Sequence, residues 1–242
     1  MKRSKTKGKV VKFTQSETVA STFRHDYPVS EDLRQVMVSE VLGDFLSWAI
    51  DRKDDDEFLT VIEEFVHGHE PRDEKRDVLL HNLFWWRLFF HSNSRSSSLK
   101  EYMAQNYHKL RKRPLILSWL KECAKAIPKF YHIGYKYNDR VLVVTDMLEA
   151  KTLDVIVYDP LAIPPKKGEI VMGTLLPLGD GLYFPIIDFY HFDYDARQDI
   201  ASHLFHYYDK HLKNSTMHEA FIHVLSVMLQ IQKLVLSDTQ TT

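Results

Sequence analysis

The stretch between Phe130 and Phe192 constrains the fold more than any other part of the chain, because five short apolar runs follow one another there without helical periodicity. Each run has the length of a strand and is rich in the β-branched and aromatic residues that suit a pleated, half-buried surface. The strands are predicted at 130–137, 140–145, 152–158, 169–176 and 182–187. Short strands with no helix between them indicate an antiparallel meander, curled into a small barrel or a strongly bent sheet.

Turn-forming residues separate these runs. The Gly-Asp-Gly sequence at 179–181 is a strong hairpin signal, because glycine adopts the left-handed backbone that tight turns require. Pro160, Pro164 and Pro165 fall between the third and fourth runs. Proline lacks a backbone N–H, so this segment is predicted to be a loop that does not pair regularly.

Helical periodicity flanks the β-rich stretch on both sides. Leu33, Met37, Val41 and Phe45 recur at a spacing of four residues after Ser30, whose hydroxyl suits a helix N-cap. Further helices are predicted from Asp54, at 73–91, from Ser98, from Pro114, at 196–211 and at 215–236. The predicted fold class is therefore α+β, with an N-terminal helical bundle, a central small antiparallel β-barrel or bent sheet, and two C-terminal helices that pack back.

Four segments follow from these patterns. The first is a disordered basic tail at 1–28, because residues 1–12 carry six lysines and arginines and no acid, and no periodicity follows them. A helical domain at 29–128, an antiparallel β module at 129–192 and the C-terminal helices at 193–238 make up the rest.

Composition limits the partners and the compartment. The 242-residue chain has a net charge of −1, so no global charge drives it to nucleic acid or to an anionic membrane. Its single cysteine, Cys123, cannot form an internal disulfide, which fits a reducing, cytoplasmic setting. The sequence has no run of about 18 apolar residues, so no membrane-spanning helix is expected. The basic N-terminus is not followed by the apolar stretch of a signal peptide.

The cluster His67, His69 and Glu70 is the candidate metal site. Two imidazoles and a carboxylate could bind zinc or nickel. The alternative is structural, because the cluster falls where a helix ends, and both Gly68 and a terminal histidine suit a helix C-terminus. We favour the structural interpretation, since no other fixed ligand accompanies the pair.

A basic patch at Lys109, Arg111, Lys112 and Arg113 is the candidate nucleic-acid site. Together with the basic tail, these cations could contact phosphates while neighbouring aromatic side chains stack on bases. The alternative is a solvated loop between two helices, and this is the interpretation that we favour.

Motifs of the common enzyme classes are absent from the sequence. There is no Gly-x-Gly-x-x-Gly, no P-loop and no Gly-x-Ser-x-Gly elbow, so no cofactor is predicted and no residue is assigned a catalytic role. Asp146, Glu149 and Lys151 resemble a metal-dependent nuclease signature. However, all three fall at a predicted turn, whereas the signature spreads them over neighbouring strands.

Several short segments resemble the globular region of bacterial SEC-C-motif proteins. These segments are 145–152, 155–159, 167–169 and 173–181, with helical matches at 84–90 and 99–107. The family pattern is a strand, Asp-Leu-Leu-x-Gly, a second strand, x-x-Gly-Asp and Arg-Leu-Leu-Pro, preceded by a Phe-x-x-Trp helix and a Tyr-rich segment. The resemblance covers about 82–187 and implies this fold and a bacterial cytoplasm.

Two departures from the family pattern limit what the resemblance implies. Ala150 replaces the glycine of the first turn, and the family's Cys-x-Cys…Cys-His zinc motif is missing. Zinc-dependent docking to the translocation or translation machinery is therefore not expected of this chain.

Three functions follow as hypotheses. The first is a non-catalytic cytoplasmic adaptor or regulatory protein that binds a macromolecular partner, most simply another protein. The second is nucleic-acid binding through the basic tail and the 108–113 patch. The third is a metal-dependent hydrolase that uses His67, His69 and Glu70, or Asp146 and Glu149. The sequence leaves the oligomeric state open.

Overall fold

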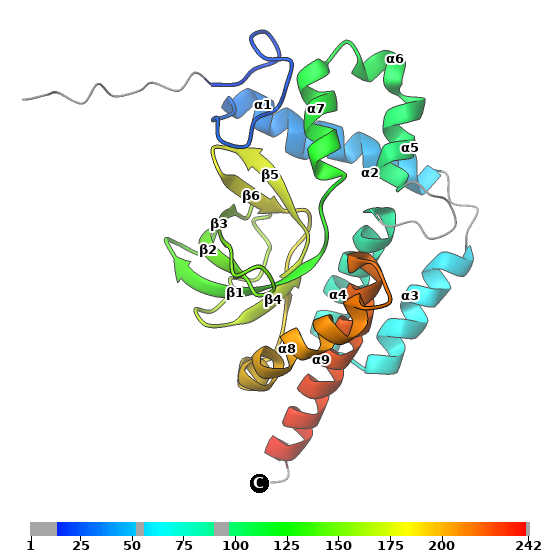
Figure 1. The fold of residues 1–242 in the computed structure, drawn as a ribbon, viewed down its shortest axis with the longest axis vertical. Helices are drawn as coiled ribbons and strands as arrows, with labels where there is room; N and C mark the ends of the chain where they lie inside the picture. Colours follow the sequence, from blue (N-terminus) through cyan, green and yellow to red (C-terminus); the bar gives the residue numbers. More distant parts are fainter. Residues whose placement is uncertain (1–13, 52–55, 90–96, 241–242) are drawn as a thin grey trace, which may run out of the picture.

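The computed structural model describes residues 14–51, 56–89 and 97–240, and it confirms the α+β fold class (Figure 1). The α-helices are α1 (Glu31–Gln35), α2 (Leu42–Asp51), α3 (Asp56–His69), α4 (Asp73–Phe89), α5 (Ser98–Gln105), α6 (Tyr107–Leu110), α7 (Pro114–Cys123), α8 (Arg197–Leu212) and α9 (Met217–Gln240). A π-helical turn, η1 (Val36–Val41), joins α1 to α2, and a 3-10 turn, η2 (Tyr194–Ala196), precedes α8. Ser30 caps α1 as predicted, because its hydroxyl accepts a hydrogen bond from the backbone N–H of Leu33.

Within the described residues, seven strands form one curled, mixed sheet with the shape of a half-barrel. They are β1 (Lys129–Lys136), β2 (Val141–Asp146), β3 (Thr152–Ile156), β4 (Ile170–Gly173), β5 (Leu175–Gly179), β6 (Leu182–Pro185) and β7 (Tyr190–His191), in the order β5-β6-β3-β2-β1-β4-β7. The prediction of a small, wholly antiparallel five-stranded meander is wrong in two respects. β3 and β6 pair in parallel, and β7 adds a strand next to β4.

The sheet curls because the fourth predicted strand is divided into two. β4 pairs with β1 near one edge of the sheet. The chain then continues into β5, which pairs with β6 at the other edge. Gly173 lies at the division, and a Cβ there would come 2.7 Å from the ring of Phe189. Only glycine fits so close to a ring, so this residue lets the chain leave one side of the sheet and join the other.

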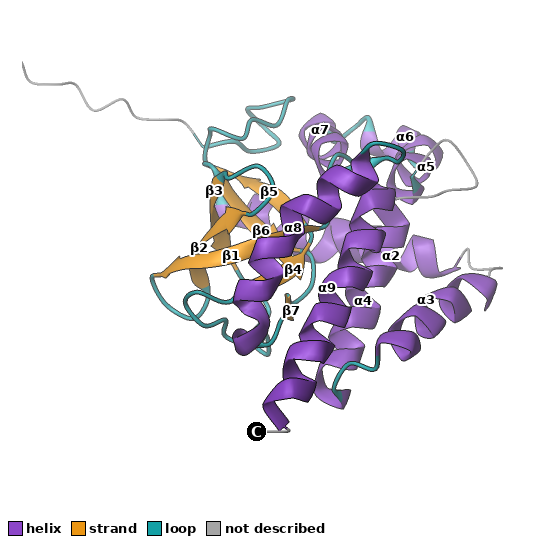
Figure 2. Ribbon diagram, turned by 60° about the horizontal axis from the view of Figure 1, so that its bottom comes forward, coloured by secondary structure: helices purple, strands orange, loops and turns teal. Residues whose placement is uncertain are grey.

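The helices are shared between two hydrophobic cores rather than gathered into one N-terminal bundle. The first core joins α1, α2, α5 and α7 to β5 and β6, through buried residues such as Phe45, Trp119 and Leu176. The second core joins α3 and α4 to α8 and α9, and Figure 2 shows these four helices on one side of the sheet. A third core fills the interior of the curled sheet. The C-terminal helices therefore complete the packing of α3 and α4.

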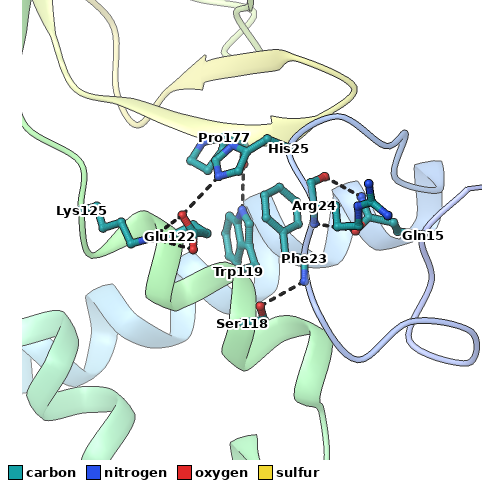
Figure 3. A network of polar contacts seen from close by, with 9 residues as sticks. All are labelled: Gln15, Phe23, Arg24, His25, Ser118, Trp119, Glu122, Lys125 and Pro177. Atoms are coloured by element: carbon teal, nitrogen blue, oxygen red, sulfur yellow. Dashed lines mark hydrogen bonds and ion pairs between the residues drawn. The ribbon is translucent and has the colours of Figure 1, made fainter.

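The segment before α1 is structured from residue 14 onward (Figure 3). The side chain of Gln15 donates to the backbone oxygens of Arg24 and Tyr27 and accepts from the Arg24 N–H, which closes the segment into a loop. Phe23 N–H donates to the Ser118 hydroxyl in α7, over 3.0 Å. The predicted disordered tail at 1–28 therefore does not extend over residues 14–28, and its basic residues 1–12 lie outside the described part.

By length and composition, residues Met217–Ser237 of α9 meet the requirement for a helix that could cross a membrane. The sequence offered no uninterrupted apolar run of that length, because polar residues such as His223 and Gln232 are interspersed. In the structure, Phe221, Val224 and Met228 of this helix are buried in the second core. Of the apolar window of this helix, 39% is buried inside the described structure.

Candidate functional site

A groove of about 330 Å³ lies between the first helices and the sheet, and we call it the apolar groove. One wall comes from η1 and α2, and the other comes from the segment that follows β6. Trp85 of α4 also contributes to the lining, and Tyr158 and Asp159 contribute from the loop after β3. The groove therefore joins four segments that lie far apart in the sequence.

The helical wall is set by residue spacing. Val38, Leu42 and Leu46 recur every four residues, so they share one face of the helix, and Ser39 and Gly43 lie beside them. The π-helical turn at 36–41 passes through this wall. Such turns interrupt α-helices mostly as single insertions, frequently at functional sites.

Gly43 leaves part of the groove open. It lies near the start of α2, where glycine costs about 1 kcal/mol relative to alanine. A Cβ at this position would meet no heavy atom within 4 Å, so the protein's own packing does not require a glycine. The missing side chain instead enlarges the groove.

The opposite wall is apolar and fixed by the sheet. Phe184 of β6 is buried, and Tyr158 packs edge-on against its ring, with the ring centroids 6.0 Å apart. Ile186 N–H donates to the carbonyl oxygen of Thr174 over 3.0 Å, which holds the segment after β6 against the division between β4 and β5. This wall is therefore preformed.

The charged residues that line the groove, among those that the structure describes, are both acidic: Asp159 and Asp188. Asp188 accepts backbone hydrogen bonds from Ile163 and Phe189, each over 2.8 Å. Burial nevertheless raises the pKa of the Asp188 carboxyl above its ordinary value. Asp159 is exposed and accepts from the Leu161 N–H over 2.8 Å, so its carboxylate faces solvent.

The loop between β3 and β4 presents apolar side chains next to the groove. Leu161 is 88% exposed and Ile163 is 50% exposed. The guanidinium of Arg140 holds the loop in place, because it donates to the backbone oxygens of Ala162 and Pro160 over 2.7 and 2.6 Å. Exposed apolar side chains on a tethered loop are a feature of protein-interaction surfaces.

The structure does not form the predicted metal site at His67, His69 and Glu70. Both ring nitrogens of His69 are occupied, by the Phe65 carbonyl oxygen at 2.7 Å and by the Ser226 hydroxyl at 2.8 Å. Glu70 forms an ion pair with Lys233 at 2.6 Å. The described residues contain no group of three or more His, Cys, Asp or Glu side chains that could hold a metal ion.

The helix end at this cluster also differs from the prediction. Gly68 lies inside α3, which ends at His69, and Glu70 adopts the left-handed backbone with a φ of 45°. Glu70 is also the residue that forms the ion pair with Lys233 of α9. The strained backbone just after α3 therefore coincides with a side-chain contact to α9.

Two of the three nuclease-like residues, Asp146 and Glu149, meet around the ammonium group of another residue, Lys129. Lys129 Nζ lies 2.6 Å from Asp146 Oδ2 and 2.5 Å from Glu149 Oε1. The other oxygen of Asp146 accepts the backbone N–H groups of Leu148 and Glu149, as in an Asx turn. A lysine thus pairs with both carboxylates, and the hypothesis that they bind a catalytic metal is not supported by this geometry.

The basic patch is only partly free for a ligand. Lys109, Arg111 and Lys112 are exposed around the turn between α6 and α7. Arg113, by contrast, donates twice to the carboxylate of Glu17, over 2.8 and 2.9 Å. The patch therefore offers three cations to solvent, and its role stays a prediction.

Sequence spacing identified the buried stripe of the first helix but not the groove. The stripe of Leu33, Met37, Val41 and Phe45 is buried, as predicted. The groove is lined by the neighbouring stripe of the same helix, which contains Val38, Leu42 and Leu46. The local sequence feature that could have pointed to it is Gly43, a glycine within an amphipathic helix. Searches of protein-family models, curated proteins and solved structures found no match to this chain. The resemblance to SEC-C-motif proteins therefore stays a prediction.

Proposed function

We propose that this chain is a non-catalytic adaptor or regulatory protein that binds an apolar segment of a partner protein in the apolar groove. The observation that carries the proposal is an open groove whose lining is apolar apart from Ser39 and two acids, next to the exposed Leu161 and Ile163. A peptide can insert a few apolar side chains into such a groove in a helical or extended form.

The charge of the groove defines the partner further. The lining includes the exposed carboxylate of Asp159, and its described residues contain no lysine, arginine or histidine. A partner segment with a lysine or arginine beside its apolar anchors is complementary to this arrangement, whereas an acidic segment is repelled. The partner is therefore an apolar segment with an adjacent basic residue.

The cytoplasm is the compartment that we propose. Cys123 is a free thiol and is buried in α7, which agrees with a reducing environment. Partners are accordingly sought among proteins of the same compartment.

Gly43 allows a direct test of the groove. Gly43→Leu adds a side chain to the groove wall at a position where a Cβ meets no heavy atom within 4 Å, and it removes a helical glycine, so we expect the fold to be retained. Gly68→Leu is the matched control, because a Cβ at Gly68 also meets nothing within 4 Å and Gly68 does not line the groove.

The measurement is photo-crosslinking in living cells, with a photoreactive amino acid in place of Ser39. We expect the unsubstituted chain and the control variant Gly68→Leu to crosslink to the same specific proteins. The Gly43→Leu variant should lose these crosslinks. Synthetic peptides from the crosslinked region should bind the purified protein with the same pattern. Equal capture by the Gly43→Leu chain would show that the groove does not bind the partner.

Nucleic-acid binding is a second candidate function, favoured by Tyr107. This side chain is 56% exposed on α6 and lies next to the three free cations of the basic patch. An exposed aromatic ring beside lysines and arginines suits stacking on unpaired bases. The test is the fluorescence anisotropy of a single-stranded RNA at increasing salt, where phosphate contacts predict a steep loss of affinity.

A charge-matched pair of variants decides this second function. The first neutralises Lys109, Arg111 and Lys112, and the control neutralises the exposed cations Arg76, Lys121 and Lys151. Weaker RNA binding in the first variant alone supports the patch. Equal loss in both variants indicates only non-specific attraction and rules the patch out.

A further inference from the structure

A second hollow, of about 340 Å³, lies on the other side of the β3–β4 loop from the apolar groove. It is formed where β7 meets the start of α4, and Figure 2 shows where these elements lie. Glu169 and His191 are both buried in its lining, and we call it the Glu169–His191 cavity. It differs from the groove because a buried glutamate and a buried histidine lie side by side in its lining.

Glu169 fixes the hydrogen-bonding state of His191. Burial opposes ionisation of Glu169, but hydrogen bonds from His191 and from the Lys166 backbone N–H hold its pKa below the ordinary value. The charged carboxylate can only accept, so Nδ1 of His191, 3.2 Å from Glu169 Oε2, carries a proton. In the neutral imidazole, Nε2 of His191 is then an acceptor.

That acceptor is unsatisfied in the described part of the chain. His191 is 7% exposed, and its Nε2 is buried without a hydrogen-bond partner. A buried acceptor that lacks a donor costs about 1–3 kcal/mol, so native proteins rarely retain one unless water or a ligand satisfies it. The cavity is large enough to admit such a ligand.

Asp193 supplies a second acceptor in the same cavity. Its Oδ1 lies 3.2 Å from Lys75 Nζ and 3.3 Å from the Arg72 guanidinium, while Oδ2 is buried and has no partner among the described residues. Gln232 of α9 holds the backbone of Asp193, because its Oε1 accepts the Asp193 N–H over 2.7 Å. The carboxylate is therefore held in place, with one oxygen left for a ligand.

The mouth of the cavity has the opposite character. Arg72 and Lys166 are exposed there, and Glu74 is the exposed acid beside them. Two cations at a mouth suit an anionic group, and the guanidinium plane suits a carboxylate in particular. Apolar and aromatic residues, among them Val78 and Ile163, line the remaining surface.

We propose that the Glu169–His191 cavity binds a small carboxylic acid with a hydrogen-bond donor, hydroxyl or ammonium, on the adjacent carbon and an apolar side chain. The carboxylate contacts Arg72 and Lys166 at the mouth. The donor points inward and satisfies His191 Nε2 or Asp193 Oδ2. The side chain covers the apolar part of the lining.

Three matched probes test the proposal: 3-phenyllactate, phenylalanine and 3-phenylpropionate. They share the carboxylate and the ring and differ in the donor, which is a hydroxyl, an ammonium or absent. Isothermal titration calorimetry should show binding of 3-phenyllactate or phenylalanine, and roughly tenfold weaker binding of 3-phenylpropionate, since it leaves the buried acceptors unpaired. The first two probes distinguish a hydroxy acid from an amino acid.

Neighbouring residues provide controls for the mouth. Lys166→Gln and Arg72→Gln should each weaken binding roughly tenfold. Lys167→Gln and Arg76→Gln should leave it unchanged, because these exposed cations do not line the cavity. All four residues are exposed, so the fold is retained. The nitrogen-15 signal of His191 Nε2 should shift on binding, with His191→Gln used to assign it.

Three outcomes would overturn the proposal. The first is that no probe binds at millimolar concentration, which would leave the acceptors to water. The second is that 3-phenylpropionate binds as tightly as the other two. The third is that Lys167→Gln weakens binding as much as Lys166→Gln. The Gly43→Leu variant should bind the probes normally, so the result is independent of the apolar groove.

Discussion

The indole Nε1 of Trp119 donates a hydrogen bond to the carbonyl oxygen of Pro177 over 2.8 Å, and this bond ties α7 to β5 (Figure 3). Trp119 is fully buried in the first core. A buried indole N–H usually has a partner, and here the partner is a backbone oxygen of an edge strand. The contact thus joins the helical part of the first core to the sheet.

Trp119→Phe should destabilise the protein by about 2–4 kcal/mol, because it leaves the Pro177 oxygen buried without a donor and opens a cavity. Urea unfolding followed by circular dichroism measures the change. Trp48→Phe is the control, since Trp48 is only partly buried and its hydrogen bond to Gln105 is longer, at 3.3 Å. Equal losses in the two variants would contradict the role given to the Pro177 contact.

Gly179→Ala should be more destabilising than Gly181→Ala. Both glycines have a positive φ, 89° and 75°, so both substitutions carry backbone strain of about 1 kcal/mol. At Gly179, however, a Cβ would also lie 2.7 Å from the Tyr27 oxygen and from Val29, whereas at Gly181 it meets nothing within 4 Å. We expect an additional loss of about 1–3 kcal/mol. Thermal unfolding of the two variants measures the difference in stability. Equal melting temperatures would show that the segment before α1 can move away from the added Cβ without loss of stability.

Glu169→Gln should destabilise the protein at about pH 7, and the difference should shrink in acid. The folded pKa of Glu169 is lowered, so its charged form stabilises the fold above the ordinary pKa of 4.5, and this contribution is lost as the pH falls through the lower folded value. Urea unfolding at neutral and acidic pH measures the difference. Glu63→Gln, an exposed control, should change stability by less than about 0.5 kcal/mol at either pH. A pH-independent effect of Glu169→Gln would rule out an ionised Glu169 carboxylate in the folded protein.

Cys123 should react with thiol reagents only when the protein unfolds. The side chain is 0% exposed, and burial raises the pKa of its thiol well above the ordinary value, so little reactive thiolate forms. Colour development with Ellman's reagent measures the rate, which should follow the unfolded population as urea is added. Cys introduced by Ala201→Cys on the exposed face of α8 should react at once. Rapid native reaction at Cys123 would contradict its burial.

Local spacing was sufficient to predict the helices. The four-residue spacing of Leu33, Met37, Val41 and Phe45 depends on one helix alone, and all four residues are buried. The cap at Ser30 is equally local, because donor and acceptor are three residues apart. Such features can be read from neighbouring residues, and they set the α+β class correctly.

Pairing between distant segments could not be predicted in the same way. The division of the fourth strand depends on the contact between Gly173 and Phe189, and the parallel pairing of β3 with β6 follows from the curl. A run of apolar residues gives no sign of which neighbour it will pair with. The sequence therefore predicted strands but not the mixed sheet.

The candidate sites were missed for a similar reason. The carboxylate of Asp193 pairs with Lys75, 118 residues earlier in the chain, so neighbouring residues give no sign of this contact. Glu169 and His191 come together because β4 and β7 are neighbours, a pairing that the sequence did not reveal. His69 and Glu70 are close in sequence, but they contact Ser226 and Lys233 of α9, and these distant partners could not be predicted from their spacing.

The sharing of the second core between α4 and the C-terminal helices has a consequence for synthesis. Leu79 and Leu83 of α4 pack in one core with Ile200 and Val224. Translation proceeds from the N-terminus at about 5–20 residues per second. The synthesis of α8 and α9 therefore follows that of α4 by roughly 5 to 30 s. During that interval its apolar side chains are exposed on the ribosome-bound chain. We therefore expect the nascent protein to bind chaperones until α9 has been synthesised and has packed against α4.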